Sequence, residues 1–384
     1  MKPAFPHSLY GVTDGTRLLP MCLRSDEDRV LPPLVDLYQF RGDDQLPFTA
    51  TDVFPEAGRR TILKQFHRFL AHEEGTRLGE DIEELHDMRV ASRRMRAAFR
   101  VFGKAIGKPL IAPYQHQLQW IAWELGKVRD LDVFLAYLRE YRGACLPENR
   151  QGLGALIQDR ESARRGARTA LLAAIDSEQF SNFKQSFAAF LDEELPPLFA
   201  LRDGHKTVAQ GAAKDLRKRF QAVIDYDERV QVSPSPETFH ELRIAIKRFR
   251  YSAEFFRDIY EGTLDPVIAE CRQMQDALGE MHDVDVHRSY LTGFAISLRN
   301  GVQSSREQRA AIDALLQSES SRRAEQQRKF ERVWGEWEQG DRRRHYVNNF
   351  SRIVGIGHPL PSTATMDACS PAGPALDNRP QKER

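Results

Sequence analysis

The chain has 384 residues, 41% of them hydrophobic, so it is long enough and apolar enough to bury a sizeable core. Its 56 lysines and arginines are almost balanced by 55 aspartates and glutamates. The resulting net charge of +1 excludes a uniformly basic protein that coats nucleic acid. It leaves room for a local basic surface, because an anion responds to where the charges lie rather than to their sum.

The sequence lacks the features that indicate secretion, a membrane span or a metal site. Its four cysteines contain no CxxC pair, so they predict neither a disulfide framework nor a zinc site. The start of the chain lacks the continuous apolar segment of a secretory signal, and no apolar run reaches the roughly 18 residues of a membrane span. We therefore expect a cytoplasmic protein with no cofactor and no bound metal.

The chain divides into an arm, a helical region and a tail. Residues 1–55 contain many prolines and turn formers and predict an irregular N-terminal arm. From residue 56 to residue 335 strong helix formers dominate and apolar positions recur every three or four residues, which predicts an all-α domain. Residues 336–384 are rich in Pro, Ser, Gly and Asn and predict a flexible C-terminal tail. Prolines and glycines separate the expected helices, which lie near 56–75, 80–103, 110–142, 148–175, 180–194, 207–231, 236–261, 264–297 and 305–338.

The helical region contains an internal repeat. The stretch 84–96 returns 154 residues later as the stretch 238–250, and both copies read H-[DE]-x-R-x-x-x-[RK]-R-x-R. A second motif, L-G-x-x-[RH]-D-x-D, begins at Leu125 and again at Leu278, at nearly the same offset. Two matched motifs at a nearly fixed separation indicate two copies of one helical unit. We call residues 56–200 the first half and residues 201–335 the second half.

The first motif places its basic residues in one row along a helix. At 100° per residue, His86, Arg89, Arg93, Arg96 and Arg100 fall within an arc of about 80°, and apolar residues border this arc on both sides. A solvated helix face normally lies opposite a single apolar stripe, so the double border indicates a partly enclosed basic trough. The second copy repeats the row with His240, Arg243, Lys247 and Arg250.

The neighbouring carboxylates are too few to neutralise these rows. Like charges one turn apart repel, and an anion bound between the rows would remove that repulsion. Two structural alternatives stay open: the arginines could extend to water or pair with carboxylates, and His86 and His240 could be core histidines that donate to a helix carbonyl. The aspartates available for internal compensation are Asp130, Asp132, Asp283 and Asp285. Basic residues elsewhere that would matter only beside the rows are Arg164, Arg168, Lys214, Arg217 and Lys218.

These motifs resemble the CHAD domain family, whose name refers to conserved histidines in an α-helical domain. The resemblance rests on residues 86–102 and their repeat 240–256, is supported by the second motif pair, and covers roughly residues 57–335. It implies two four-helix bundles related by pseudo-twofold symmetry around a central basic cavity. It also implies binding of inorganic polyphosphate, association with polyphosphate granules and no catalytic reaction. The first 55 residues carry no ExExK strand motif, so the chain does not resemble the CYTH triphosphatase domain that some members also contain.

Carried over position by position, the resemblance implies a binding site on both basic helices. Glu254 occupies the position that matches Arg100, so we expect the second row to hold an anion less firmly at its outer end. The implied polyphosphate-binding residues are His86, Arg89, Arg93, Arg94 and Arg96 in the first half and His240, Arg243, Lys247, Arg248 and Arg250 in the second.

Two other functions are weighed against polyphosphate binding. A helical metal-dependent phosphohydrolase would use His-Asp pairs as ligands, but a dication beside several guanidinium groups is electrostatically disfavoured. RNA or DNA binding is the second alternative, although no helix-turn-helix, zinc or aromatic stacking pattern supports it. The sequence also lacks a glycine-rich phosphate loop and a nucleophile with a partner. We therefore expect a protein that binds polyphosphate, and possible further polyanions, without being an enzyme.

Overall fold

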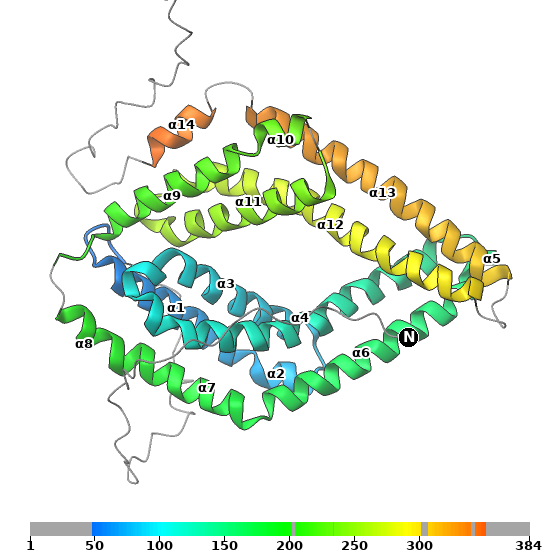
Figure 1. Ribbon diagram of the computed structural model, residues 1–384, viewed down its shortest axis with the longest axis horizontal. Coiled ribbons are helices and arrows are strands. Elements are labelled where there is room, and N and C mark those ends of the chain that lie inside the picture. Colours follow the sequence, from blue (N-terminus) through cyan, green and yellow to red (C-terminus); the bar gives the residue numbers. More distant parts are fainter. Residues whose placement is uncertain (1–47, 202–203, 233, 301–305, 339–341, 351–384) are drawn as a thin grey trace, which may run out of the picture. The chain divides into compact units, whose positions relative to one another are not determined.

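The computed structural model describes residues 48–201, 204–232, 234–300, 306–338 and 342–350, all within the compact unit Phe40–Arg384. The described residues are almost entirely helical and contain no strand, only an isolated bridge between Val53 and Thr207 (Figure 1). The predicted all-α fold is confirmed. Most of the predicted arm and all of the tail after residue 350 lie outside the described residues.

Each half contributes a series of helices in chain order. Those of the first half are α1 (Phe54–Ala71), α2 (Glu73–Leu78), α3 (Ile82–Ile106), α4 (Lys108–Ala144), α5 (Pro147–Gly152), α6 (Gly154–Ile175), α7 (Glu178–Ala189), the π-helical turn η2 (Phe190–Glu194) and α8 (Leu195–Ala200). Those that follow are α9 (Val208–Ile224), α10 (Asp227–Val232), α11 (Pro236–Phe256), the 3-10 turn η3 (Asp258–Tyr260), α12 (Asp265–Asn300), α13 (Arg306–Glu338) and α14 (Arg342–Asn349). Among the described helices, none combines the length and the apolar composition that crossing a membrane requires.

Several helix boundaries differ from the sequence prediction for local reasons. The stretch near 56–75 is divided at His72 into α1 and α2, and the stretch near 148–175 is divided at Leu153 into α5 and α6. Helical structure instead continues through the two prolines after residue 195, because Pro is tolerated in the first turn of a helix such as α8. The chain after Gly340 also forms α14, which ends beside Phe350, a residue with 0% exposure.

Within each half, neighbouring helices pack as antiparallel pairs. In the first half α3 packs against α1 and α4, and α4 packs against α6; in the second half α11 packs against α9 and α12, and α12 packs against α13 (Figure 1). The two basic helices therefore take corresponding places in the two halves. Their apolar flanks supply much of the core: Met88, Met95 and Phe102 of α3 are each 0% exposed.

The basic helices α3 and α11 meet directly through repeat-related aromatic residues. The ring of Phe102 contacts the ring of Phe256 in an edge-to-face arrangement with centroids 5.7 Å apart. Phe54, at the start of α1, covers both, with centroid distances of 4.9 Å to Phe102 and 6.1 Å to Phe256. Because both phenylalanines are completely buried, this contact fixes the positions of the two basic rows relative to each other.

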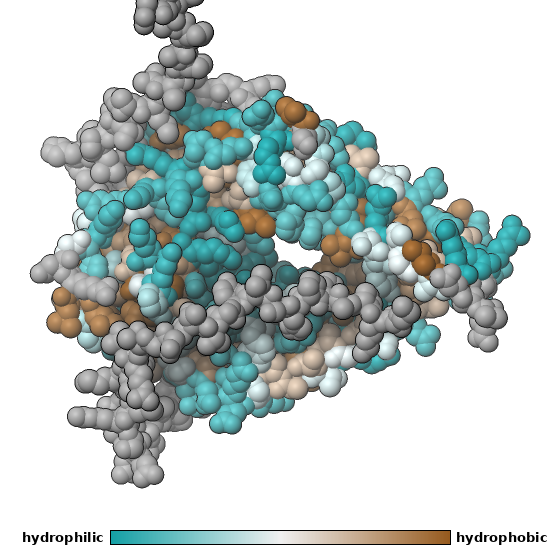
Figure 2. Space-filling view, in the orientation of Figure 1, coloured by the Kyte–Doolittle hydropathy of each residue, from teal (hydrophilic) through white to brown (hydrophobic). Residues whose placement is uncertain are grey.

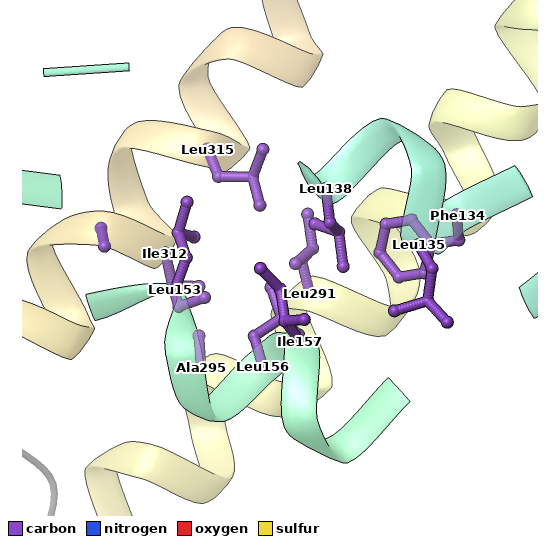
Figure 3. Close-up of a cluster of buried hydrophobic side chains, with 11 residues drawn as sticks. Phe134, Leu135, Leu138, Leu153, Leu156, Ile157, Leu291, Ala295, Ile312 and Leu315 are labelled. Carbon is purple, nitrogen blue, oxygen red and sulfur yellow. The ribbon is translucent and has the colours of Figure 1, made fainter. Parts of the chain in front are cut away.

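A second contact joins the two halves at the far ends of the long helices. Apolar side chains of α4, α6, α12 and α13 form one buried cluster (Figure 3), which we call the joint. Gly152 lies against α13 so closely that a Cβ atom there would stand 2.5 Å from the backbone oxygen of Glu307, so the approach requires glycine. Figure 2 shows an opening between the helices of the two halves, beside the region where α3 and α11 meet. The side chains of the joint include Leu135, Leu138, Leu156, Leu291, Ile312 and Leu315.

Candidate functional site

Both basic helices begin at a capped N-terminus that sets the start of each row. The Asp81 side chain accepts a hydrogen bond from the backbone of Glu83 at 2.8 Å, at the start of α3. The Ser235 hydroxyl accepts one from the backbone of Thr238 at 3.2 Å, at the start of α11. Such caps stabilise a helix by about 1 kcal/mol each. The rows therefore begin at corresponding points of the two halves.

Cations from both rows converge around Lys247. Burial, together with the neighbouring charges of Arg93, Arg243, Arg89 and Arg250, lowers the pKa of Lys247 to about 7. Burial and the same kind of like-charge neighbours also lower the pKa of Arg93. Arg93 and Lys247 are repeat-related positions, so the structure brings the middle of one row against the middle of the other. We call Arg89, Arg93, Arg243, Lys247 and Arg250 the central cluster.

Few carboxylates approach this central cluster. Arg89 forms an ion pair with Asp130, with Nη2 3.3 Å from Oδ1. Arg93, Arg243 and Lys247 form no ion pair with any carboxylate of the described residues, and the Nε atom of Arg93 is buried without a hydrogen-bond partner there. Leaving buried donors unpaired is unfavourable by about 1–3 kcal/mol for each group. An anion that bound here would supply the missing acceptors.

The glycines of the second motif lie beneath the arginines of the first. A Cβ atom added to Gly126 of α4 would stand 3.8 Å from Nε of Arg89, and one added to Gly279 of α12 would stand 3.5 Å from Nη2 of Arg243. Each arginine therefore packs against its neighbouring helix at a glycine, where no side chain stands in the way. This geometry explains why the two motifs recur together in both halves.

The histidines of the two rows differ in their surroundings. In the first half His86 is half-buried, and burial followed by the charge of Arg129 lowers its pKa. Its Nδ1 atom is buried and has no hydrogen-bond partner among the described residues, so this nitrogen is not the satisfied donor that a core histidine would have. In the second half the ring of His240 is exposed and lies 4.9 Å from the ring of His282. Burial, with Arg243 and His240 nearby, lowers the pKa of His282.

Glu254 closes the outer end of the second row. Its side chain is only 8% exposed and accepts hydrogen bonds from Arg94 at 3.1 Å, Arg250 at 2.7 Å and Arg272 at 3.1 Å. Arg94 and Arg250 also lie over the ring of Tyr251. The sequence showed that glutamate stands at position 254 where the first half has Arg100. No pattern in it indicated that Arg272 would donate to this carboxylate or that Tyr251 would lie under Arg94 and Arg250.

The outer end of the first row has a different environment. Burial, followed by the charges of Arg96, Arg248 and Arg219, lowers the pKa of Arg100. Arg100 and Arg248 line a cavity of about 1170 Å³ together with Lys214 and Lys218 of α9. We call it the side cavity. Two of the supporting candidates from the sequence therefore do lie beside a basic row.

The other supporting residues take part in contacts away from the rows. Asp132 of α4 pairs with Arg164 of α6, and the repeat-related Asp285 of α12 pairs with Arg323 of α13 at 2.7 Å. These two aspartates therefore join neighbouring helices and do not neutralise the rows. Arg168 donates to the backbone oxygens at the end of α2, including that of Arg77 at 2.9 Å. Asp283 is a charged neighbour of Asp130, Arg217 lies near Tyr260, and neither belongs to the central cluster.

The arrangement offers no group of ligands for a metal within the described part of the chain. No three His, Cys, Asp or Glu side chains there lie close enough together to hold an ion. What α3 and α11 do bring together is an excess of guanidinium and ammonium groups over carboxylates. That arrangement is chemically suited to holding several negatively charged groups at once.

Comparison with known proteins is consistent with these paired basic helices. The model of the CHAD domain matches residues 60–292, which include both copies of both motifs. The chain belongs to the CHAD domain family. The crystal structure of the CHAD domain from the plant Ricinus communis matches it with a TM-score of 0.62 and 25% sequence identity, over 76% of this chain and 96% of that chain. The resemblance that the motifs indicated is confirmed.

Other relatives of this CHAD protein are more distant. PptA from Streptomyces chartreusis shares the fold, with a TM-score of 0.57 and 17% identity over 74% of this chain and 100% of that chain. Two uncharacterized proteins of Mycobacterium tuberculosis, from strains CDC 1551 and H37Rv, are each 24% identical over 243 residues. The match covers 62% of this chain and 45% of each relative, so the chain spans less than half the length of these curated relatives.

Proposed function

We propose that this CHAD protein binds inorganic polyphosphate between α3 and α11 and that it does so without catalysing a reaction. The observation that carries the proposal is the convergence of Arg93 and Lys247, from the two copies of the repeat, in a cluster that lacks enough carboxylates. A chain of phosphates places negative groups at short, regular intervals, so one chain can contact cations from both rows. Family membership supports this ligand class, and we infer that the protein associates with polyphosphate granules in the cytoplasm.

Binding would rest on multivalent pairing of phosphate oxygens with guanidinium forks and with the Lys247 ammonium group. Guanidinium groups pair with phosphate through two parallel hydrogen bonds, which gives geometric preference as well as attraction. The buried Nε atom of Arg93 and Nδ1 atom of His86 supply further polar atoms that have no partner among the described residues. Arg94 is held by Glu254, so its contribution to phosphate binding would be smaller than that of Arg93.

The salt dependence of binding tests this proposal directly. Titration with long-chain polyphosphate at about 50 mM and about 200 mM salt should show affinity falling by about 100- to 500-fold, as expected when about five cations release counterions. Calorimetry or fluorescence anisotropy would measure both dissociation constants. Competition with RNA of equal total charge is the accompanying control. Displacement of polyphosphate by RNA of equal total charge would contradict the proposal and favour the nucleic-acid alternative.

The lowered pKa of Lys247 predicts that binding takes up a proton. With a pKa of about 7 in the free protein, the ammonium group loses its charge as the pH rises above neutrality, and a bound polyanion favours the charged form. Affinity should therefore fall by up to about tenfold between about pH 7 and about pH 8.5. Burial lowers the pKa of His86 and of His282 below the ordinary 6.5, so these rings stay neutral in this range. The Lys247→Arg variant should bind with little pH dependence there; an unchanged slope in that variant would argue against this origin.

A further inference from the structure

The side cavity is a partly open space with a basic lining, and it lies outside the central cluster. It lies between the C-terminal part of α3, the length of α9 and residues 241–248 of α11, and its volume is about 1170 Å³. Six cationic side chains line it without forming an ion pair to any described carboxylate: Arg100, Lys104, Lys206, Lys214, Lys218 and Arg248. Apolar groups of Phe54, Val101 and Ile244 also line it.

The carboxylates that also line this cavity are already occupied. Asp215 accepts from Arg219 at 2.6 Å and from the Ser252 hydroxyl. Glu241 pairs with Arg229 at 2.8 Å. Asp225 accepts a hydrogen bond from the Gln221 amide at 2.8 Å. The side cavity therefore keeps an excess of positive charge, which an anion from solution can neutralise.

Comparison of the two copies of the repeat indicates which chemical group fits the side cavity. On the other side of the α3–α11 contact, Arg94 and Arg250 hold the buried carboxylate of Glu254. Their repeat-related residues are Arg248 and Arg96, and the residue that corresponds to Glu254 is Arg100. The same arginine arrangement therefore surrounds a carboxylate on one side and a third arginine on the other. After burial, the charges of Arg96 and Arg248 lower the pKa of Arg100, which is expected where these cations are neighbours.

We propose that the side cavity is a second anion-binding site, which takes a compact oligophosphate in the place that the Glu254 carboxylate holds on the opposite side. The site is separate from the central cluster, because α9 supplies part of its wall and none of the five central residues lines it. The inference does not rest on polyphosphate binding at the central cluster, since the two sites have no lining residue in common. Arg100, Arg248 and Lys218, from three different helices, would contact the ligand.

Inorganic triphosphate is the probe that tests the side cavity. Calorimetric titration of the full chain should show triphosphate binding at the side cavity, and Arg100→Glu should lower the stoichiometry by one. The substitution installs the residue found at the equivalent position of the second half, so Arg96 and Arg248 gain the carboxylate that Arg94 and Arg250 already have. We therefore expect the melting temperature to stay equal or to rise. The matched control is Arg139→Glu, which makes the same charge change at a side chain of α4 that is 59% exposed.

A second arm separates this proposal from the first. The variant with Arg93→Glu and Lys247→Glu lacks the centre of the central cluster and should still bind one triphosphate. Adding Arg100→Glu to this variant should abolish that binding. The proposal is overturned if Arg100→Glu binds triphosphate with the stoichiometry of the Arg139→Glu control. It is also overturned if the central-cluster variant, shown by circular dichroism to be folded, binds no triphosphate. If that variant loses long-chain polyphosphate binding but keeps triphosphate binding, the result concerns the central cluster and leaves the side-cavity proposal standing.

Discussion

Replacing Arg93 and Lys247 together by glutamate should reduce the affinity for long-chain polyphosphate by about 100- to 1,000-fold, because truncating or reversing a buried charge contact typically changes binding by 2 kcal/mol or more. The same substitutions should raise the free energy of unfolding by about 1–2 kcal/mol. Like-charge neighbours and burial lower the pKa of both residues, so their charged forms destabilise the folded state. Two glutamates in their place would pair with the remaining arginines of the central cluster.

This prediction combines two opposite effects: the affinity for polyphosphate falls, and the free energy of unfolding rises. Affinity is measured by titration at low salt, and stability by the midpoint of urea unfolding at neutral pH. The control replaces Arg139 and Arg299 by glutamate, with the same change in net charge at side chains that are 59% and 65% exposed. Their ion pairs are at the surface and contribute little, so the control should keep both its affinity and its stability. Equal loss of affinity in the two double variants would mean that polyphosphate follows net charge and not a specific cluster.

The second large effect is expected beside the joint, where Glu319→Ala should lower the free energy of unfolding by about 2–3 kcal/mol, the usual cost of leaving a buried polar group without its charged acceptor. The Glu319 side chain is 0% exposed and lies 3.2 Å from Nδ1 of His287. The His287 ring stacks on Phe134 of the first half at 4.2 Å between centroids. Removing the carboxylate would leave His287 without its acceptor and would leave Arg322 paired with Glu280 alone. Urea unfolding at neutral pH measures the loss.

The pH dependence of this loss gives an internal check. Burial raises the pKa of Glu319, but hydrogen bonds from His287 and Tyr137 together with the nearby charge of Arg322 outweigh burial and hold the pKa below the ordinary 4.5. A depressed folded-state pKa contributes stability that is present above the unfolded value and is lost as the pH falls through the folded value. The difference between wild type and Glu319→Ala should therefore shrink below about pH 4. Glu319→Gln, which keeps the shape, should fall between the two proteins at neutral pH. A loss that stayed constant into acid would rule out the carboxylate charge as its source.

The predicted helices and the basic rows came from patterns that act over three or four residues. The order of the long helices agrees with the structure, and the repeat-related rows do lie on corresponding helices, α3 and α11. The same patterns failed where a break depends on one or two residues, as at Leu153, or where a proline enters a first turn, as in α8. Such details are decided by local hydrogen bonding, to which residue periodicity is insensitive.

The amino-acid sequence by itself determined the all-α class, the duplication and the placement of His86, Arg93 and Lys247 in basic rows, since each depends on residues that are close neighbours along one helix. Only the tertiary structure decided which cations remain without carboxylates. Glu254 reaches Arg94 across 160 positions of the chain, whereas Arg100 meets other arginines. The physical reason is that a helix fixes which side chains share a face, while the neutralisation of a charge depends on which distant helix packs against that face.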